Sequence, residues 1–123
     1  MRLFEPILIP TLRDAIVDKH VDSIVLATHG VEIRFDDITV FCSESITAVI
    51  SQKAYTFDEG PVDGPWGLLL RQTVKDVDLE SSSALRVDFS SGDSVQFRTV
   101  VGPYESVQIT YPNDGDNFVM DIF

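Results

Sequence analysis

The sequence is short of the residues from which most metal and redox sites are built. It contains one cysteine, Cys42, and two histidines, His20 and His29, so no intrachain disulfide is possible and a reducing compartment suits the chain. Neither histidine has a cysteine or a second histidine at the spacing of metal ligands. We therefore expect no metal site and no cofactor.

Motifs of nucleophilic catalysis are also missing. Serines are numerous, but none lies in a Gly-x-Ser-x-Gly turn, and no glycine-rich phosphate loop follows a predicted strand. Cys42 follows Val40 and Phe41, which favours a buried apolar residue over a nucleophile. We predict no catalytic residue and a protein that is not an enzyme.

Long apolar runs are absent too. The apolar stretch near the N-terminus is interrupted by Glu5, Pro6 and Pro10, and it has no small-residue cleavage site. It therefore predicts neither a signal peptide nor a membrane span. We expect a cytoplasmic protein that does not contact membranes.

Basic residues are few compared with acidic ones. Nine Lys and Arg stand against 20 Asp and Glu, which gives a net charge of −11. Such a charge repels nucleic acid and anionic membranes, and it accelerates association with a cationic protein. We expect a cationic protein partner and no direct contact with nucleic acid. The alternative is that the acidity only keeps the protein soluble.

Alternation of apolar and polar residues is what the sequence has in abundance. In segments 24–35 and 85–97 the apolar side chains alternate with charged ones on both sides of a glycine turn. Segment 46–50 continues this pattern, and segments 107–111 and 118–122 flank an Asn-Asp-Gly-Asp-Asn turn. We predict a single domain, 1–123, that is mainly β and antiparallel.

The pattern occurs twice along the chain. Leu12 to Asp18 is similar to Leu70 to Asp76, 58 positions later (70 − 12), and Ile33 is matched with Phe97. We predict two tandem antiparallel units, 12–50 and 70–111, separated by a connection at 51–69 and followed by the C-terminal hairpin strand at 112–123. The two units should pack into one sandwich or one strongly twisted sheet.

The first segment of each unit is ambiguous. In 11–20, Thr11 can cap a helix, and Leu12, Ala15, Ile16 and Lys19 have helical spacing. Its counterpart at 70–79 is rich in β-branched residues. We predict a strand in both copies, with a helix as the alternative for the first.

Two acidic sets are candidates for the partner surface. Asp76, Asp78 and Glu80 alternate along a predicted strand and therefore share a face, although such a row is also typical of a solvated strand. The second set comprises Asp58, Glu59, Asp63 and Trp66 in the connection, which is interrupted by glycine and proline. Here an aromatic anchor is surrounded by charge, and the alternative is that Trp66 fills the seam between the units.

Segments 68–77 (LLLRQTVKDV), 84–93 (ALRVDFSSGD) and 104–107 (YESV) resemble those of small acidic bacterial β domains. Several such domains are immunity proteins or are encoded beside toxins. The resemblance implies a non-enzymatic inhibitor, monomeric or homodimeric, that occludes the active site of a cationic toxin or effector, for example a nuclease. The alternatives are an inhibitor that mimics DNA, a small-ligand or enzymatic domain with a pocket between the units, and a structural subunit that pairs through an edge strand.

Overall fold

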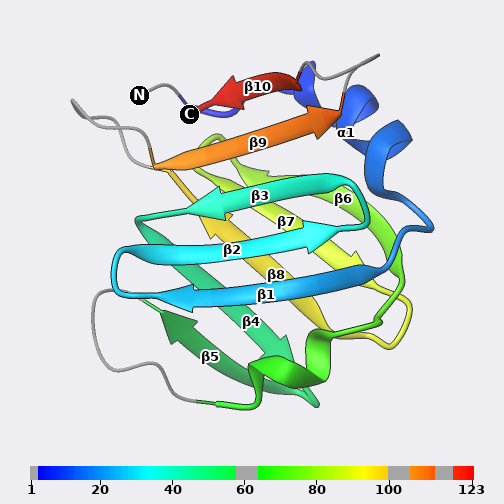
Figure 1. The fold of residues 1–123 in the computed structure, drawn as a ribbon, viewed down its shortest axis with the longest axis vertical. Coiled ribbons are helices and arrows are strands. Elements are labelled where there is room, and N and C mark those ends of the chain that lie inside the picture. Colours follow the sequence, from blue (N-terminus) through cyan, green and yellow to red (C-terminus); the bar gives the residue numbers. More distant parts are fainter. Residues whose placement is uncertain (1–2, 58–63, 100–105, 113–117) are drawn as a thin grey trace.

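The fold is a sandwich of two antiparallel five-stranded sheets (Figure 1). The computed structural model describes residues 3–57, 64–99, 106–112 and 118–123. Sheet 1 has the order β1 (Val21–Ala27), β2 (Gly30–Phe35), β3 (Ile38–Cys42), β9 (Val107–Pro112) and β10 (Phe118–Ile122). Sheet 2 has the order β5 (Lys53–Phe57), β4 (Ser45–Ile50), β8 (Ser94–Arg98), β7 (Ala84–Phe89) and β6 (Val74–Ser81). The predicted mainly β, antiparallel sandwich is confirmed.

Each sheet combines strands from both halves of the chain. Three consecutive strands, β1 to β3, form most of sheet 1 and are completed by β9 and β10. In sheet 2, the consecutive strands β6 to β8 are completed by β4 and β5. If β1 to β5 are exchanged with β6 to β10, the strand order of each sheet becomes that of the other. Because each sheet is incomplete without two strands from the other half, neither half encloses a core alone.

The same exchange holds where β1 and β6 begin. An isolated antiparallel bridge joins the residues just before these strands, His20 and Thr73. Four backbone N–H groups flank it and donate in matching pairs: Asp18 to Val74 O (2.9 Å), Arg71 to Val21 O (2.8 Å), Val21 to Gln72 O (3.0 Å) and Val74 to Lys19 O (2.9 Å). Asp18 and Arg71 both have a φ of 70°. Residues 53 positions apart thus correspond here (71 − 18 = 74 − 21).

This correspondence differs from the one that the sequence suggested. The shift of 58 positions is wrong, because hydrogen bonding and strand order match Val21 with Val74. Ile33 and Phe97 are both fully buried, as predicted. They are not equivalent, however, because Ile33 lies on the second strand of its half and Phe97 on the third strand of the other. The structural counterpart of β2 is β7.

The N-terminal segment forms a helix, so the predicted strand at 11–20 is wrong. Helix α1 (Leu8–Ile16) buries Leu8, Ile9, Leu12 and Ile16. Leu8, Leu12 and Ile16 are spaced four residues apart, which places them on one face of a helix. Pro10 is tolerated because it lies in the first turn, where backbone N–H groups have no acceptor within the helix. In the second half, most of the matching segment is β6, as predicted.

Two strands, β3 and β5, were not predicted from the sequence. β3 follows β2 after the two-residue turn Asp36-Asp37, and β5 lies inside the predicted connection 51–69. The rest of that connection includes a short 3₁₀ helix, η1 (Trp66–Leu69). β5 was missed because only Phe57 of its side chains is buried, so its alternation is weak.

A helical segment lies beside each outer edge of the sandwich core. α1 contacts β6, and η1 contacts β1 and β4 (Figure 1). Each precedes the first strand of its half, so the two are equivalent under the exchange of halves. α1 contributes four apolar side chains to the core, whereas η1 contributes Trp66 and Leu69. These two sides of the molecule are called the α1 side and the η1 side below.

Candidate partner-binding surfaces

The acidic row of β6 is neutralised in part by arginines of the same chain. Arg13 Nε lies 2.8 Å from Asp76 Oδ1, and Arg13 Nη2 lies 3.7 Å from Asp78 Oδ2. Glu80 pairs with Arg86, whose Nε also lies 3.1 Å from a carboxylate oxygen of Asp88. Arg86 stands opposite Asp78 in the register of β6 and β7. These contacts tie the predicted acidic row to two arginines, in two separate groups of ion pairs.

The contact with Arg13 changes the pKa of Asp76. A hydrogen bond from the Arg13 side chain, helped by the Val77 backbone N–H, lowers the pKa of the Asp76 carboxyl below its ordinary value. The side chain remains 45% exposed, so solvent screens this interaction. In the two groups of ion pairs, two arginines oppose four carboxylates, so the face carries less charge than the row of acids alone implied.

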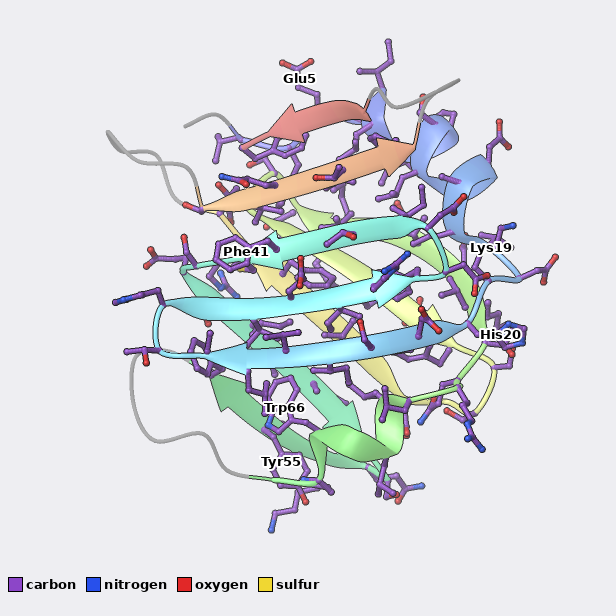
Figure 2. The ribbon with its side chains drawn as sticks, viewed as in Figure 1. Glu5, Lys19, His20, Phe41, Tyr55 and Trp66 are labelled. Carbon is purple, nitrogen blue, oxygen red and sulfur yellow. The ribbon has the colours of Figure 1, made fainter. Side chains whose placement is uncertain are left out.

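Trp66 is in the core, with 2% of its surface exposed. Figure 2 shows it beside Tyr55 on the η1 side, and the Cα of Gly64 approaches the Tyr55 ring so closely that a Cβ would overlap it. This burial fits the alternative that Trp66 fills a seam, and it leaves no exposed indole to anchor a partner. Asp58, Glu59 and Asp63, the other members of that candidate set, lie outside the described residues.

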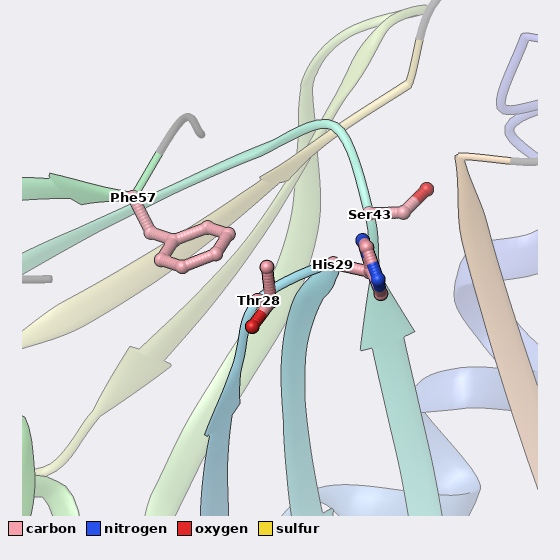
Figure 3. A pocket seen from close by; sticks show the side chains of 4 residues that line it. All are labelled: Thr28, His29, Ser43 and Phe57. Carbon is pink, nitrogen blue, oxygen red and sulfur yellow. The ribbon is translucent and has the colours of Figure 1, made fainter. Parts of the chain in front are cut away.

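A pocket of about 280 Å³ opens where β5 ends, and it is lined by Thr28, His29, Ser43 and Phe57 (Figure 3). The Phe57 ring forms one wall and faces Thr28, while His29 and Ser43 form the other. Thr28 and His29 belong to the turn between β1 and β2, and Ser43 follows β3. An apolar wall facing several polar groups suits a side chain with an apolar stem and a polar end.

Acidic residues adjoin this pocket in the sequence. Glu44 is exposed and follows the pocket residue Ser43. Asp58 and Glu59 follow Phe57 directly, and the chain contains no Lys, Arg or His between Lys53 and Arg71. The acidic residues of that stretch are therefore without a basic neighbour along the chain, in contrast to those of β6.

A second pocket, of about 480 Å³, lies between the halves. The turn after β4 contributes Ser51 and Gln52, and the turn after β7 contributes Ser91, Gly92 and Asp93. Asp93 accepts hydrogen bonds from the Ser51 N–H (3.0 Å) and from Gln72 Nε2 (2.8 Å), one on each carboxylate oxygen. Both oxygens are thus engaged in holding loops together.

The residues considered for metal or nucleophilic chemistry are Cys42, His20 and His29. Cys42 is buried, its Sγ lies 3.3 Å from Ser45 O, and burial raises the pKa of its thiol. His20 is exposed beside the Thr73 bridge, while His29 lines the first pocket. Within the described ranges, no three His, Cys, Asp or Glu side chains gather so as to hold a metal ion. No helix in those ranges is long and apolar enough to cross a membrane.

Arg13 and Arg86 are the functional residues that the sequence reasoning missed. Arg86 was within reach, because folding 74–89 as a hairpin places it opposite Asp78. Arg13 was not, since it is 63 residues from Asp76 and approaches it only because α1 packs beside β6.

Comparisons with protein-family models, curated proteins and solved structures found no match for this chain. The resemblance to immunity-protein-like domains therefore remains a prediction.

Proposed function

We propose that this protein is a non-catalytic inhibitor of the immunity-protein kind, which binds a cationic protein at the end of the sandwich around Phe57. The observation that carries the proposal is the uneven distribution of basic residues around the acidic ones along the chain. Asp76, Asp78 and Glu80 are paired with the chain's own arginines. Asp58, Glu59 and Asp63 lie in a stretch without basic residues that starts beside the pocket.

The pocket contributes a surface that fits a basic side chain. Its Phe57 wall can accept the methylene stem of a Lys or Arg side chain, while Thr28, His29 and Ser43 offer polar atoms. The carboxylates of Glu44 and of the acidic residues that follow Phe57 in the sequence attract a cationic surface over long range and accelerate the encounter. A toxin whose active site binds phosphates presents such a surface, and a protein seated on it blocks access to substrate.

The test compares two variants with the same change of charge. One is Asp58→Asn/Glu59→Gln/Asp63→Asn, and the other is Asp76→Asn/Asp78→Asn/Glu80→Gln. A partner captured from the native cells is purified, and its binding to each variant is measured by surface plasmon resonance at several salt concentrations. We expect the first variant to associate about tenfold more slowly or worse, and the second to retain wild-type association within a few-fold.

Inhibition is measured on the same purified partner. Its activity, once identified, should fall in the presence of the wild-type protein and recover with the first variant. Equal loss of binding in both variants would mean that net charge alone guides the partner. Unchanged binding in the first variant, or a complex that leaves the partner fully active, would overturn the proposal.

The alternative of a small-ligand domain rests on the second pocket. It draws on both halves, as the sequence-based alternative required. We favour the inhibitor, because the Asp93 carboxylate in that pocket bonds to Ser51 and Gln72 on both oxygens. A carboxylate engaged in this way stabilises turns more readily than it receives a ligand.

A further inference from the structure

β1 and β6 occupy equivalent places in the two halves, yet their surfaces differ in kind. Both are edge strands, and both have an irregular register after the first residue. β6 carries Lys75, Asp76, Asp78 and Glu80, and charged side chains protect a sheet edge from pairing with other strands. β1 has the sequence VDSIVLA, with Asp22 as its single charge. Of these two equivalent edges, β1 is the one that lacks this protection.

Exposed apolar side chains gather on the same side. Four of the six exposed large apolar residues in the described part are Val25 (48%), Leu26 (41%), Leu68 (59%) and Leu70 (44%), and the other two, Ile7 (78%) and Leu3 (38%), lie just before α1. Of the first four, two are on β1, and two are on or directly after η1, which contacts β1. Burial of such side chains in an interface stabilises association.

The edge of β1 is also open for pairing. Its first residue, Val21, bonds through its backbone to Arg71 and Gln72. From 22 to 27, no described backbone group outside sheet 1 hydrogen-bonds to the strand. Unpaired N–H and C=O groups in an extended strand are a template for a further strand.

The charge of the chain indicates which protein supplies that further strand. Two copies of a chain with a net charge of −11 repel each other, so they can approach only through a surface that is close to neutral. β1 itself carries one charged residue, Asp22, which lies 3.8 Å from Arg34, while Glu32 of β2 stands opposite Val25. A cationic partner gains nothing from such a surface, whereas a second copy offers the same apolar strand in return.

We propose that two copies of this chain pair their β1 strands antiparallel about a two-fold axis near Val25, forming one continuous sheet from both copies. The two Val25 side chains then face each other on the outer surface, and Leu68 and Leu70 lie at the margin. In this register Asp22 stands opposite Thr28 of the other copy. The two Asp22 residues are then about 20 Å apart, beyond the screening length of about 8 Å at physiological salt.

The first experiment measures the mass of the full chain by sedimentation over a wide range of concentration. We expect the wild type to reach twice its monomer mass of 13.7 kDa. Val25→Lys places two like charges face to face and should raise the dissociation constant at least about tenfold. Thr11→Lys makes the same charge change at an exposed site of α1 and should leave the dimer intact. A monomeric wild type, or equal dimerisation of both variants, would overturn the proposal.

A second measurement does not depend on how Val25→Lys folds. Cys42 is 1% exposed, so the new thiol in Val25→Cys is the reactive one. Mild oxidation should link Val25→Cys into a covalent dimer within minutes, because residues facing each other across antiparallel strands lie within disulfide reach. Thr11→Cys serves as the control and should remain monomeric under denaturing electrophoresis. Equal cross-linking of the two variants would contradict pairing through β1.

Salt separates this proposal from the proposed function. Raising salt screens the repulsion between two acidic copies and should strengthen the dimer, whereas it should weaken binding of a cationic partner. A dimer that dissociates as salt rises would contradict the apolar β1 interface. Such a result would leave the inhibitor proposal untouched.

Discussion

The α1 side and the η1 side of the sandwich cover the core with helices of different kinds and lengths. On the α1 side, a nine-residue helix covers the core and extends Arg13 over the acidic strand β6. On the η1 side, a four-residue 3₁₀ helix fills the core with Trp66 and Leu69, and the apolar strand β1 lies beside it. Strand order makes the two sides equivalent. The comparison teaches that the fold fixes where an edge strand lies, while the side chains decide whether that edge is charged, as in β6, or largely apolar, as in β1.

The strongest test of this comparison removes the side chain that fills each side. Trp66→Ala should destabilise the protein by about 3–5 kcal/mol and Leu12→Ala by about 2–5 kcal/mol, because both side chains are almost completely buried. Urea denaturation followed by circular dichroism measures both values. A cost below about 1 kcal/mol for Trp66→Ala would show that η1 is not a structural counterpart of α1.

A smaller effect is expected at Gly30, the first residue of β2. A Cβ there would lie 2.6 Å from Cys42 O and 2.7 Å from Phe41 Cζ, whereas β7 begins with Ala84 at the equivalent place. Gly30→Ala should therefore cost about 1–3 kcal/mol through overpacking.

Gly67→Ala is the control for this overpacking. A Cβ at Gly67 meets nothing within 4 Å, so we expect a change near zero in the free energy of unfolding. A Gly30→Ala variant as stable as Gly67→Ala would show that the Phe41 ring moves aside without cost, and that the two hairpins differ less than their packing indicates.

The smallest effect concerns the ion pairs of the α1 side. Arg13→Gln removes the main cause of the lowered Asp76 pKa, so NMR titration should find that pKa raised toward its ordinary value. Because the pKa is lowered in the folded state, pairing stabilises the protein above the ordinary carboxyl pKa, and this contribution is lost as the pH falls through the folded pKa. At neutral pH the variant should lose about 0.2–1 kcal/mol, as is typical of exposed pairs.

Arg34→Gln is the matched control, because Arg34 lies near Asp22 on the η1 side and not near Asp76. It should leave the Asp76 titration unchanged. If both variants shift the Asp76 pKa equally, the shift reflects the overall charge of the protein instead of the Arg13 contact.

Much of the fold was predictable because strand alternation is a local property. Ile33, Val87 and Phe97 are fully buried and alternate with polar neighbours. The sequence therefore predicted which face of β2, β7 and β8 is buried. The helix at 8–16 was predicted as a strand because a spacing of four between apolar residues also occurs in strands. Packing against β6 favours the helix. Matching Ile33 with Phe97 failed because similar alternation recurs in most strands of a sandwich.

The candidate surfaces depended more on contacts between distant residues. Alternation places Asp76 and Asp78 opposite Asp88 and Arg86 in the register, whereas Glu80 falls at the irregularity between Leu79 and Ser81. That Arg13 neutralises part of the acidic row of β6 follows only from the position of α1 beside β6. The burial of Trp66 was one of two alternatives that the sequence left open, since an aromatic residue among glycines and prolines occurs both in cores and at interfaces.

The sequence by itself determined that this chain forms amphipathic antiparallel strands, where several of the hairpins lie, and that the protein is strongly acidic. The tertiary structure alone decided that β4–β5 and β9–β10 join the sheet of the other half, that Arg13 pairs with Asp76, and that η1 lies beside β1. The reason is physical: alternation and composition act within a few residues, whereas strand partners and ion pairs are chosen by packing between segments far apart in the chain.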